Sequence, residues 1–198
     1  MVRSSKKFIF PVVGILALGI LALGLAACET TPPPPKLPEL TFTHLGPLKL
    51  NVARIDIVSK YRSPLRAPNV EHLFPTPPQK ALRTWARDRL RAVGRSGTAR
   101  LVIHKASAVE TALEMKKGLK AAFTKQQSHR YDVTLDATLE ISTPEGRGSA
   151  TAQASQFSTL REDATINDRN KIWFDLTENL MRDFNAEMEK KLGPFLVR

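Results

Sequence analysis

The sequence has 198 residues, and its 30 Lys and Arg residues outnumber its 19 Asp and Glu residues, giving a formal net charge of +11 at pH 7. It has a single cysteine, which excludes an intramolecular disulfide, so a folded domain must be stable through its hydrophobic core. The length allows one ordinary domain beyond an atypical N-terminal stretch.

The first 27 residues have the three parts of an export signal. Basic residues lie at positions 3, 6 and 7, and residues 8–27 carry no charge and consist mainly of Leu, Ile, Val, Ala and Gly. The stretch ends in Leu25-Ala26-Ala27-Cys28, which resembles the lipobox of bacterial lipoproteins: an aliphatic residue, two small residues and a cysteine. This pattern predicts a signal peptide over residues 1–27.

The resemblance implies three modifications at Cys28. A diacylglyceryl group is attached to its sulfur, the chain is cleaved before it, and the new amino terminus is acylated. Such an anchor would hold the protein stably in a membrane, whereas one acyl chain alone gives only marginal binding. By resemblance to lipoprotein sorting, Glu29 in the second mature position favours the outer membrane over the inner membrane, with the domain facing the periplasm.

An uncleaved transmembrane helix is the alternative for the same stretch, because roughly 20 apolar residues span a bilayer. Against it, no basic stop-transfer cluster follows, and prolines occupy positions 32–35. Further prolines at positions 38 and 47 predict an extended, semi-rigid tether over residues 28–47. Residues 48–198 are then expected to form a single periplasmic domain.

The domain is predicted to begin with a strand and a helix. Alternating apolar residues indicate a strand over Leu48–Ser59, with a bulge near Ala53 where the apolar phase shifts by one residue. After a proline-interrupted loop, a capping threonine followed by Pro77 predicts the start of a helix. Gly94 is expected to end this helix as a left-handed C′ residue.

Three strands and a long helix are predicted in the rest of the chain. A strand lies around Arg100–Glu110, and the basic stretch Thr111–Ser128 is interpreted as a long hairpin connection, with a short helix as the alternative. Tyr131–Ile141 alternates strictly between apolar and polar residues, and a strand with alternating alanines follows a turn. Apolar residues spaced four apart predict a helix over Asn167–Leu192, which Gly193 ends.

This β-α-β-β-β-α order predicts an α+β fold in which two helices cover one face of a four-stranded, mainly antiparallel sheet. With the lipobox and the tether, it is similar to small envelope lipoproteins, among them auxiliary lipoproteins of lipid-trafficking ABC transporters and the lipoprotein component of lipopolysaccharide assembly. Residues 68–75, 130–132 and 173–177 also resemble stretches of uncharacterised alphaproteobacterial lipoproteins. The resemblance implies partner binding and carries no catalytic residue.

Motifs for catalysis and metal binding do not occur in the sequence. Neither a G-x-S-x-G nucleophile turn nor a G-x-x-x-x-G-K-[ST] phosphate loop is found. The histidines are scattered and none pairs at helical spacing: His44, His72, His104 and His129. We therefore expect neither an enzyme nor a metal site, and no cofactor apart from the covalent diacylglycerol and acyl chain on Cys28.

Four arginines recur at four-residue intervals on the predicted first helix. Like charges at this spacing destabilise a helix by a few tenths of a kcal/mol per pair, which favours contact with an anionic partner such as lipid headgroups, lipopolysaccharide phosphates or an acidic protein. A merely soluble face is the alternative. The candidate contact residues are Arg83, Arg87, Arg91 and Arg95. Arg89 lies within the apolar arc, so we expect it to pair with a carboxylate at the core margin or to extend outward.

The loop before this helix is a second candidate contact surface, because apolar residues lie there among prolines and basic residues. The candidate partner-binding residues are Tyr61, Leu65, Val70 and Phe74. As an alternative, Leu73 and Phe74 pack under the start of the helix and have a purely structural role.

These features predict a non-enzymatic, membrane-anchored accessory or binding subunit of an envelope transport or assembly complex, with an envelope protein as its partner. One alternative is a binder of anionic lipid or lipopolysaccharide that uses the basic helix, and another is an enzyme of unrecognised type. Nucleic-acid binding would suit the positive charge, but export and the lack of aromatic residues interleaved with the arginines argue against it.

Overall fold

The computed structural model describes residues 37–116, 118 and 124–197. The predicted signal peptide, Cys28 and most of the tether lie outside the described residues. The described residues belong to one compact unit, Lys36–Arg198. Within them, no helix combines the length and the apolar character needed to cross a membrane.

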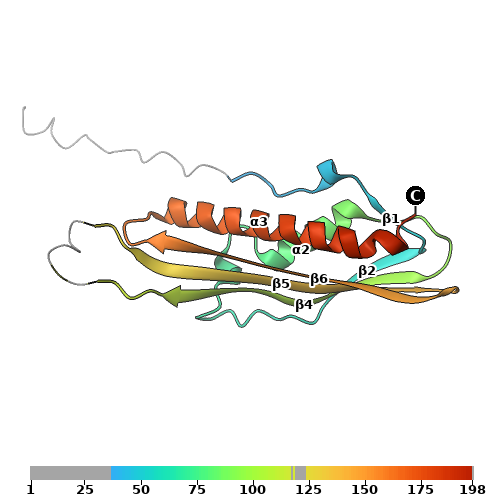
Figure 1. Cartoon of the computed structure of the whole chain (residues 1–198), viewed down its shortest axis with the longest axis horizontal. Coiled ribbons are helices and arrows are strands. Elements are labelled where there is room, and N and C mark those ends of the chain that lie inside the picture. Colours follow the sequence, from blue (N-terminus) through green and yellow to red (C-terminus); the bar gives the residue numbers. More distant parts are fainter. Residues whose placement is uncertain (1–36, 117, 119–123, 198) are drawn as a thin grey trace, which may run out of the picture. The chain divides into compact units, whose positions relative to one another are not determined.

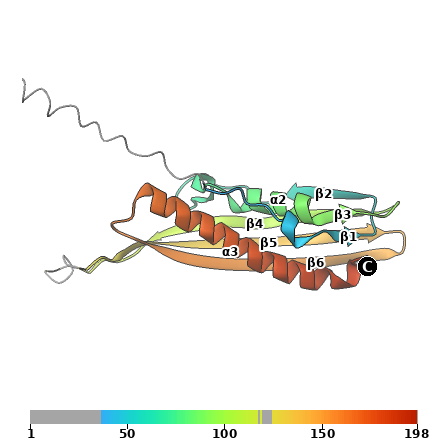
Figure 2. The ribbon, with the colours of Figure 1, turned by 90° about the horizontal axis from the view of Figure 1, so that it is seen from above.

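A four-stranded sheet and two helices form the domain (Figure 1). The strand order is β2-β4-β5-β6, in which β2 runs parallel to β4 and the other two pairs are antiparallel. Both helices lie over the same face of the sheet (Figure 2). This arrangement confirms the predicted α+β fold. The elements are β2 (Arg54–Ser59), α2 (Pro78–Arg89), β4 (Thr98–Ala112), β5 (Gln127–Thr143), β6 (Gly146–Arg161) and α3 (Ile166–Leu192).

A second, two-stranded sheet was not predicted. It consists of β1 (Leu48–Leu50) and β3 (Leu90–Ala92), which pair in parallel. The predicted single strand over 48–59 is therefore wrong: the shift of phase near Ala53 is a break between β1 and β2, which belong to different sheets. Apolar and polar residues alternate within each half of the segment, so the sequence pattern alone is that of one strand with a bulge.

The predicted end of the first helix at Gly94 is also wrong, because α2 ends at Arg89 and Leu90 adopts an extended conformation as it enters β3. Gly94 lies beyond β3, where its amide donates to the Val52 carbonyl. A Cβ atom at Gly94 would lie 2.5 Å from Asn51 Oδ1 and 2.6 Å from the Asn51 carbonyl carbon. This glycine is thus explained by the close approach of two backbones, without a left-handed conformation.

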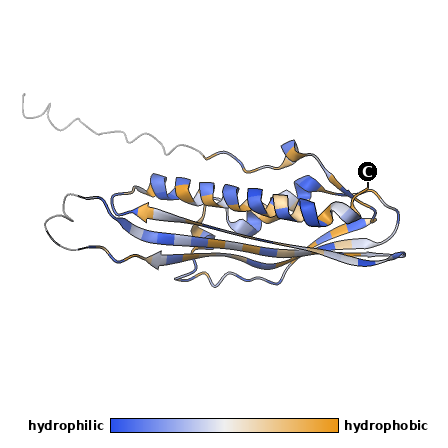
Figure 3. Ribbon diagram, in the orientation of Figure 1, coloured by the Kyte–Doolittle hydropathy of each residue, from blue (hydrophilic) through white to orange (hydrophobic). Residues whose placement is uncertain are grey.

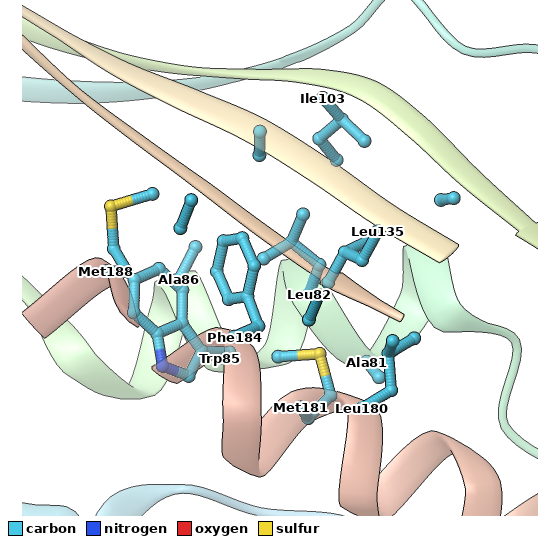
Figure 4. Close-up of a cluster of buried hydrophobic side chains, with 14 of the residues drawn as sticks. Ala81, Leu82, Trp85, Ala86, Ile103, Leu135, Leu180, Met181, Phe184 and Met188 are labelled. Carbon is cyan, nitrogen blue, oxygen red and sulfur yellow. The ribbon is translucent and has the colours of Figure 1, made fainter. Parts of the chain in front are cut away.

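The core lies between the helices and the inner face of the sheet (Figure 4). Trp85 of α2 and Phe184 of α3 meet edge to face, with ring centroids 5.4 Å apart. The alternating alanines of β6 are buried beneath α3, where their small side chains allow the helix to approach the sheet closely. Hydropathy alternates along the strands and around α3, as one-sided burial requires (Figure 3).

The segment before β1 is tied to both helices through Arg89, which is only 1% exposed. Its guanidinium donates to the Leu45 and Gly46 carbonyls and to Glu189 Oε2, the last at 2.7 Å. The predicted pairing of Arg89 with a carboxylate is confirmed. Phe42 is buried nearby, so packing of the chain onto the domain begins before Leu48.

Candidate binding site

The loop between β2 and α2 is fixed to the sheet along the edge of β4. The Tyr61 amide donates to the Ile103 carbonyl, and the Val70 amide donates to the Ala108 carbonyl at 2.9 Å. Pro68 accepts from the Glu110 amide at 2.8 Å. The loop therefore continues the edge of the sheet beyond the end of β2, and its backbone is held by main-chain hydrogen bonds.

A buried carboxylate holds the two arms of this loop together. Glu71 is 3% exposed, and its side chain accepts a hydrogen bond of 2.6 Å from the Tyr61 hydroxyl and one of 3.2 Å from the Ala108 amide. Burial alone would raise the pKa of the Glu71 carboxyl. Hydrogen bonds from the hydroxyls of Ser63 and Tyr61 and from two backbone amides outweigh burial, so this pKa lies below its ordinary value.

The same contact involves Tyr61, one of the predicted partner-binding residues. Burial and the neighbouring Glu71 carboxylate raise the pKa of the Tyr61 hydroxyl above its ordinary value, so the hydroxyl stays protonated and donates. Tyr61 is thus a structural support of the loop in this arrangement.

The other loop residues divide into a buried pair and an exposed pair. Val70 and Phe74 are buried, and the Phe74 ring stacks on Trp173 with centroids 4.7 Å apart. Leu65 is 65% exposed, with a positive φ of 55°, and Leu73 is 56% exposed. The apolar side chains of the loop that solvent can reach are therefore Leu65 and Leu73, whereas Val70 and Phe74 position the backbone. Of the two residues for which packing under the helix was the alternative, Phe74 is buried, whereas the exposure of Leu73 does not support such a role.

An open hollow of about 560 Å³ lies between this loop and α2. Ser63, Glu71 and His72 line it from the loop, and Lys80, Arg83 and Arg87 line it from the helix. The three basic residues are spaced i, i+3 and i+7, so they share one face of α2. We call this feature, defined by these six residues, the basic hollow.

The basic side chains of the hollow have no carboxylate partner among the described residues. Arg87 donates to the Thr84 hydroxyl at 3.2 Å. Glu71, the one carboxylate in the lining, already accepts hydrogen bonds from the loop itself. The hollow thus presents three cations to solvent, an arrangement that suits an anionic group.

The predicted row of four arginines on one helix is wrong, because α2 ends before Arg91. Arg91 lies in β3, where it donates to the Arg87 and Leu90 carbonyls, and Arg95 lies in the turn that follows. Only Arg83 and Arg87 remain together, and Lys80 joins them. Lys80 was not among the predicted contact residues, although its position three residues before Arg83 places it on the same helical face.

Two other polar residues considered as candidates, His104 and Asp132, form contacts outside the basic hollow. His104 lies within hydrogen-bonding distance of the Thr138 hydroxyl, at 3.1 Å, and Asp132 forms a bidentate pair with Arg130. In the described part of the chain, no group of three or more His, Cys, Asp or Glu side chains is placed to hold a metal ion.

No family model matches the sequence, and no curated protein sequence matches it. Among solved structures, the crystal structure of rare lipoprotein B from Shewanella oneidensis is similar over 71% of this chain and 95% of that chain, at 7% sequence identity and a TM-score of 0.38. A similarity of this size establishes neither a shared fold nor a shared function.

Proposed function

We propose that this chain is a lipid-anchored, non-enzymatic accessory protein of the bacterial envelope, which binds an anionic group of an envelope protein in the basic hollow. The lipobox ending at Cys28 supports the anchor, the periplasmic location and the covalent lipid, and Glu29 favours the outer membrane. The partner would belong to a transport or assembly complex.

The basic hollow is the observation that carries the proposal. Lys80, Arg83 and Arg87 converge there without a carboxylate partner, and like charges on one helical face destabilise the helix slightly when nothing neutralises them. An anionic partner removes this repulsion. Because Glu71 and the main-chain hydrogen bonds already fix the loop, binding requires little ordering of the backbone.

The shape of the site favours a protruding protein group over a flat lipid surface. A long stripe of four arginines would suit a membrane plane, but Arg91 and Arg95 lie outside α2. The remaining cations line a concave hollow, and the exposed Leu65 and Leu73 lie on the loop that forms its wall. Apolar contacts beside paired charges are typical of protein–protein interfaces.

Photo-crosslinking in cells tests the proposal. A photoreactive residue at Leu65 is expected to give a specific protein adduct, and Arg83→Gln/Arg87→Gln is expected to reduce its yield roughly tenfold by removing two charge contacts. The matched control is Lys171→Gln/Lys190→Gln, which removes the same charge from exposed positions on α3 and should leave the yield unchanged. Equal yields from both variants would refute a role for the hollow.

Anionic lipid is the competing ligand, since its phosphate groups have the same charge as a carboxylate. Binding of the protein to vesicles containing phosphatidylglycerol is expected to be the same for the Arg83→Gln/Arg87→Gln variant and the control variant. A selective loss of vesicle binding in the Arg83→Gln/Arg87→Gln variant, without any protein adduct from Leu65, would assign the hollow to lipid instead.

A further inference from the structure

The two edges of the main sheet differ in how they are protected. At one edge, β2 has only six residues, and Arg54 and Asp56 form an ion pair of 3.1 Å there. Beyond β2, residues 68–70 cover the edge of β4 through main-chain hydrogen bonds. Short strands, charged side chains and covering loops are the usual means by which proteins prevent unwanted strand pairing.

The other edge is β6, where none of these features occurs between Gly148 and Leu160. It is 16 residues long, which corresponds to about 50 Å, and no strand of the described chain pairs with its outer side (Figure 2). From Gly148 to Leu160 it contains no charged residue and no proline. The register shift between β5 and β6 lies at one extreme end and is on β5, between Gln127 and His129. The edge of β6 is thus long and regular, and it carries charge only at its two ends.

We propose that β6 pairs with β6 of a second copy of this chain, antiparallel and across a two-fold axis at Gln153, so that one sheet continues through both copies. Each copy carries a net positive charge, so a stable contact between copies requires an edge without like charges. The uncharged stretch of β6 meets this requirement, and serine, threonine and glutamine side chains form favourable cross-strand pairs.

The distribution of charge along β6 favours this register over the one centred on Ala154. In this register, Gln153 of one copy lies opposite Gln153 of the second copy, and Thr151 of each copy lies opposite Ser155 of the other. Arg161 of each copy then comes beside Glu145 of the other. A register centred on Ala154 would instead place Arg147 opposite Arg161, which is unfavourable. Both registers keep the helices on one side of the joined sheet, so electrostatics decides between them.

The same pairing accounts for an exposed aromatic residue near the edge. Phe157 is 59% exposed, and the Arg130 guanidinium lies 3.9 Å from its ring centroid. In the register centred on Gln153, Ser149 of the second copy lies directly opposite Phe157 and covers part of its ring. Burial of this apolar surface adds to the main-chain hydrogen bonds of the paired strands.

The test is the mass of the full chain in detergent micelles, measured by light scattering. The wild-type chain is expected to be a dimer. The Thr151→Lys/Ser155→Lys variant places lysine opposite lysine across the two copies and is expected to raise the dissociation constant tenfold or more. In the control variant, Thr151→Lys/Ser155→Glu, lysine lies opposite glutamate, so this variant should remain dimeric. Both variants change exposed positions, and circular dichroism checks that both are folded.

A photoreactive residue at Thr151 gives a second readout. It is expected to crosslink two copies, with the adduct mapped by mass spectrometry to residues near Ser155. A monomer at all concentrations, a dimer unaffected by the two lysines, or adducts with other proteins only would each overturn the proposal. The Arg83→Gln/Arg87→Gln variant should stay dimeric, so failure of this inference is distinguishable from failure of the proposed function.

Discussion

At the scale of single residues, Glu71 shows how a carboxylate can be buried without a basic partner. Hydroxyl groups and backbone amides supply the donors, and they lower the pKa of the carboxyl despite burial. Charge-assisted hydrogen bonds of this kind are about twice as strong as neutral ones. The position of the loop, and with it one wall of the basic hollow, depends on this group.

We expect Glu71→Gln to lower the free energy of unfolding by about 1–3 kcal/mol, since it removes the charge from the hydrogen bonds that the hydroxyls and backbone amides donate and leaves buried donors poorly matched. Urea unfolding measures this change. Tyr61→Phe should cost less, about 1 kcal/mol, because it removes one donor. A larger loss of unfolding free energy in the Tyr61→Phe variant than in the Glu71→Gln variant would contradict this account.

The lowered pKa of Glu71 also makes a prediction about pH. Because the folded pKa lies below the unfolded value of about 4.3, the contribution of Glu71 is complete above that pH and is lost as the pH falls through the folded pKa. The Glu71→Gln variant has no carboxyl group at this position, so its stability should lack this pH-dependent contribution. The wild-type protein and the variant should therefore converge in stability on acidification, as urea unfolding at several pH values would show.

At the scale of elements, α2 is short because the residues that follow it form a strand instead of a further helical turn. Residues 90–92 pair with β1, and the Val93 amide donates to the Leu50 carbonyl, which extends the contact. These hydrogen bonds replace those of a further helical turn. Gly94 then passes so close to Asn51 that a side chain has no room.

Gly94→Ala is expected to destabilise the protein by about 1–3 kcal/mol, because the added methyl group would overlap backbone atoms that cannot move aside easily. The matched control is Gly193→Ala, where a Cβ atom would meet nothing within 4 Å and the backbone is right-handed helical. Thermal unfolding of both variants measures the difference. Equal stability of the two variants would show that the close approach is unimportant.

At the scale of the whole molecule, the two proposed contacts are of opposite physical kinds. The basic hollow presents cations, so its binding is expected to weaken as salt rises. The edge of β6 is uncharged between Gly148 and Leu160, so pairing there should depend little on salt. A molecule with both contacts can hold a partner and a second copy through separate surfaces.

Raising the salt concentration from about 0.1 M to about 1 M shortens the Debye length from about 10 Å to about 3 Å. Over this range, crosslinking from Leu65 in isolated envelopes should fall strongly, whereas the dimeric mass in micelles should persist. Loss of the dimer at high salt, with crosslinking retained, would reverse the assignment of the two surfaces.

The sequence alone was sufficient to predict the most regular elements. The strict alternation of Tyr131–Ile141 lies within β5, and the four-residue spacing of Asn167–Leu192 lies within α3. Both elements are long and bury one continuous side, so the periodicity of their own residues specifies their structure. The pattern Leu25-Ala26-Ala27-Cys28, which resembles a lipobox, is likewise local, and the lipidation of Cys28 stays a prediction.

Tertiary structure alone decided the features that depend on residues far apart in the chain. The break near Ala53 and the end of α2 at Arg89 follow from the pairing of β1 with β3, whose strands lie about forty residues apart. The basic hollow forms because main-chain bonds to β4 bring the loop against α2. Local periodicity contains no information about such partners, since hydrogen bonds between distant segments are chosen only when the whole chain packs.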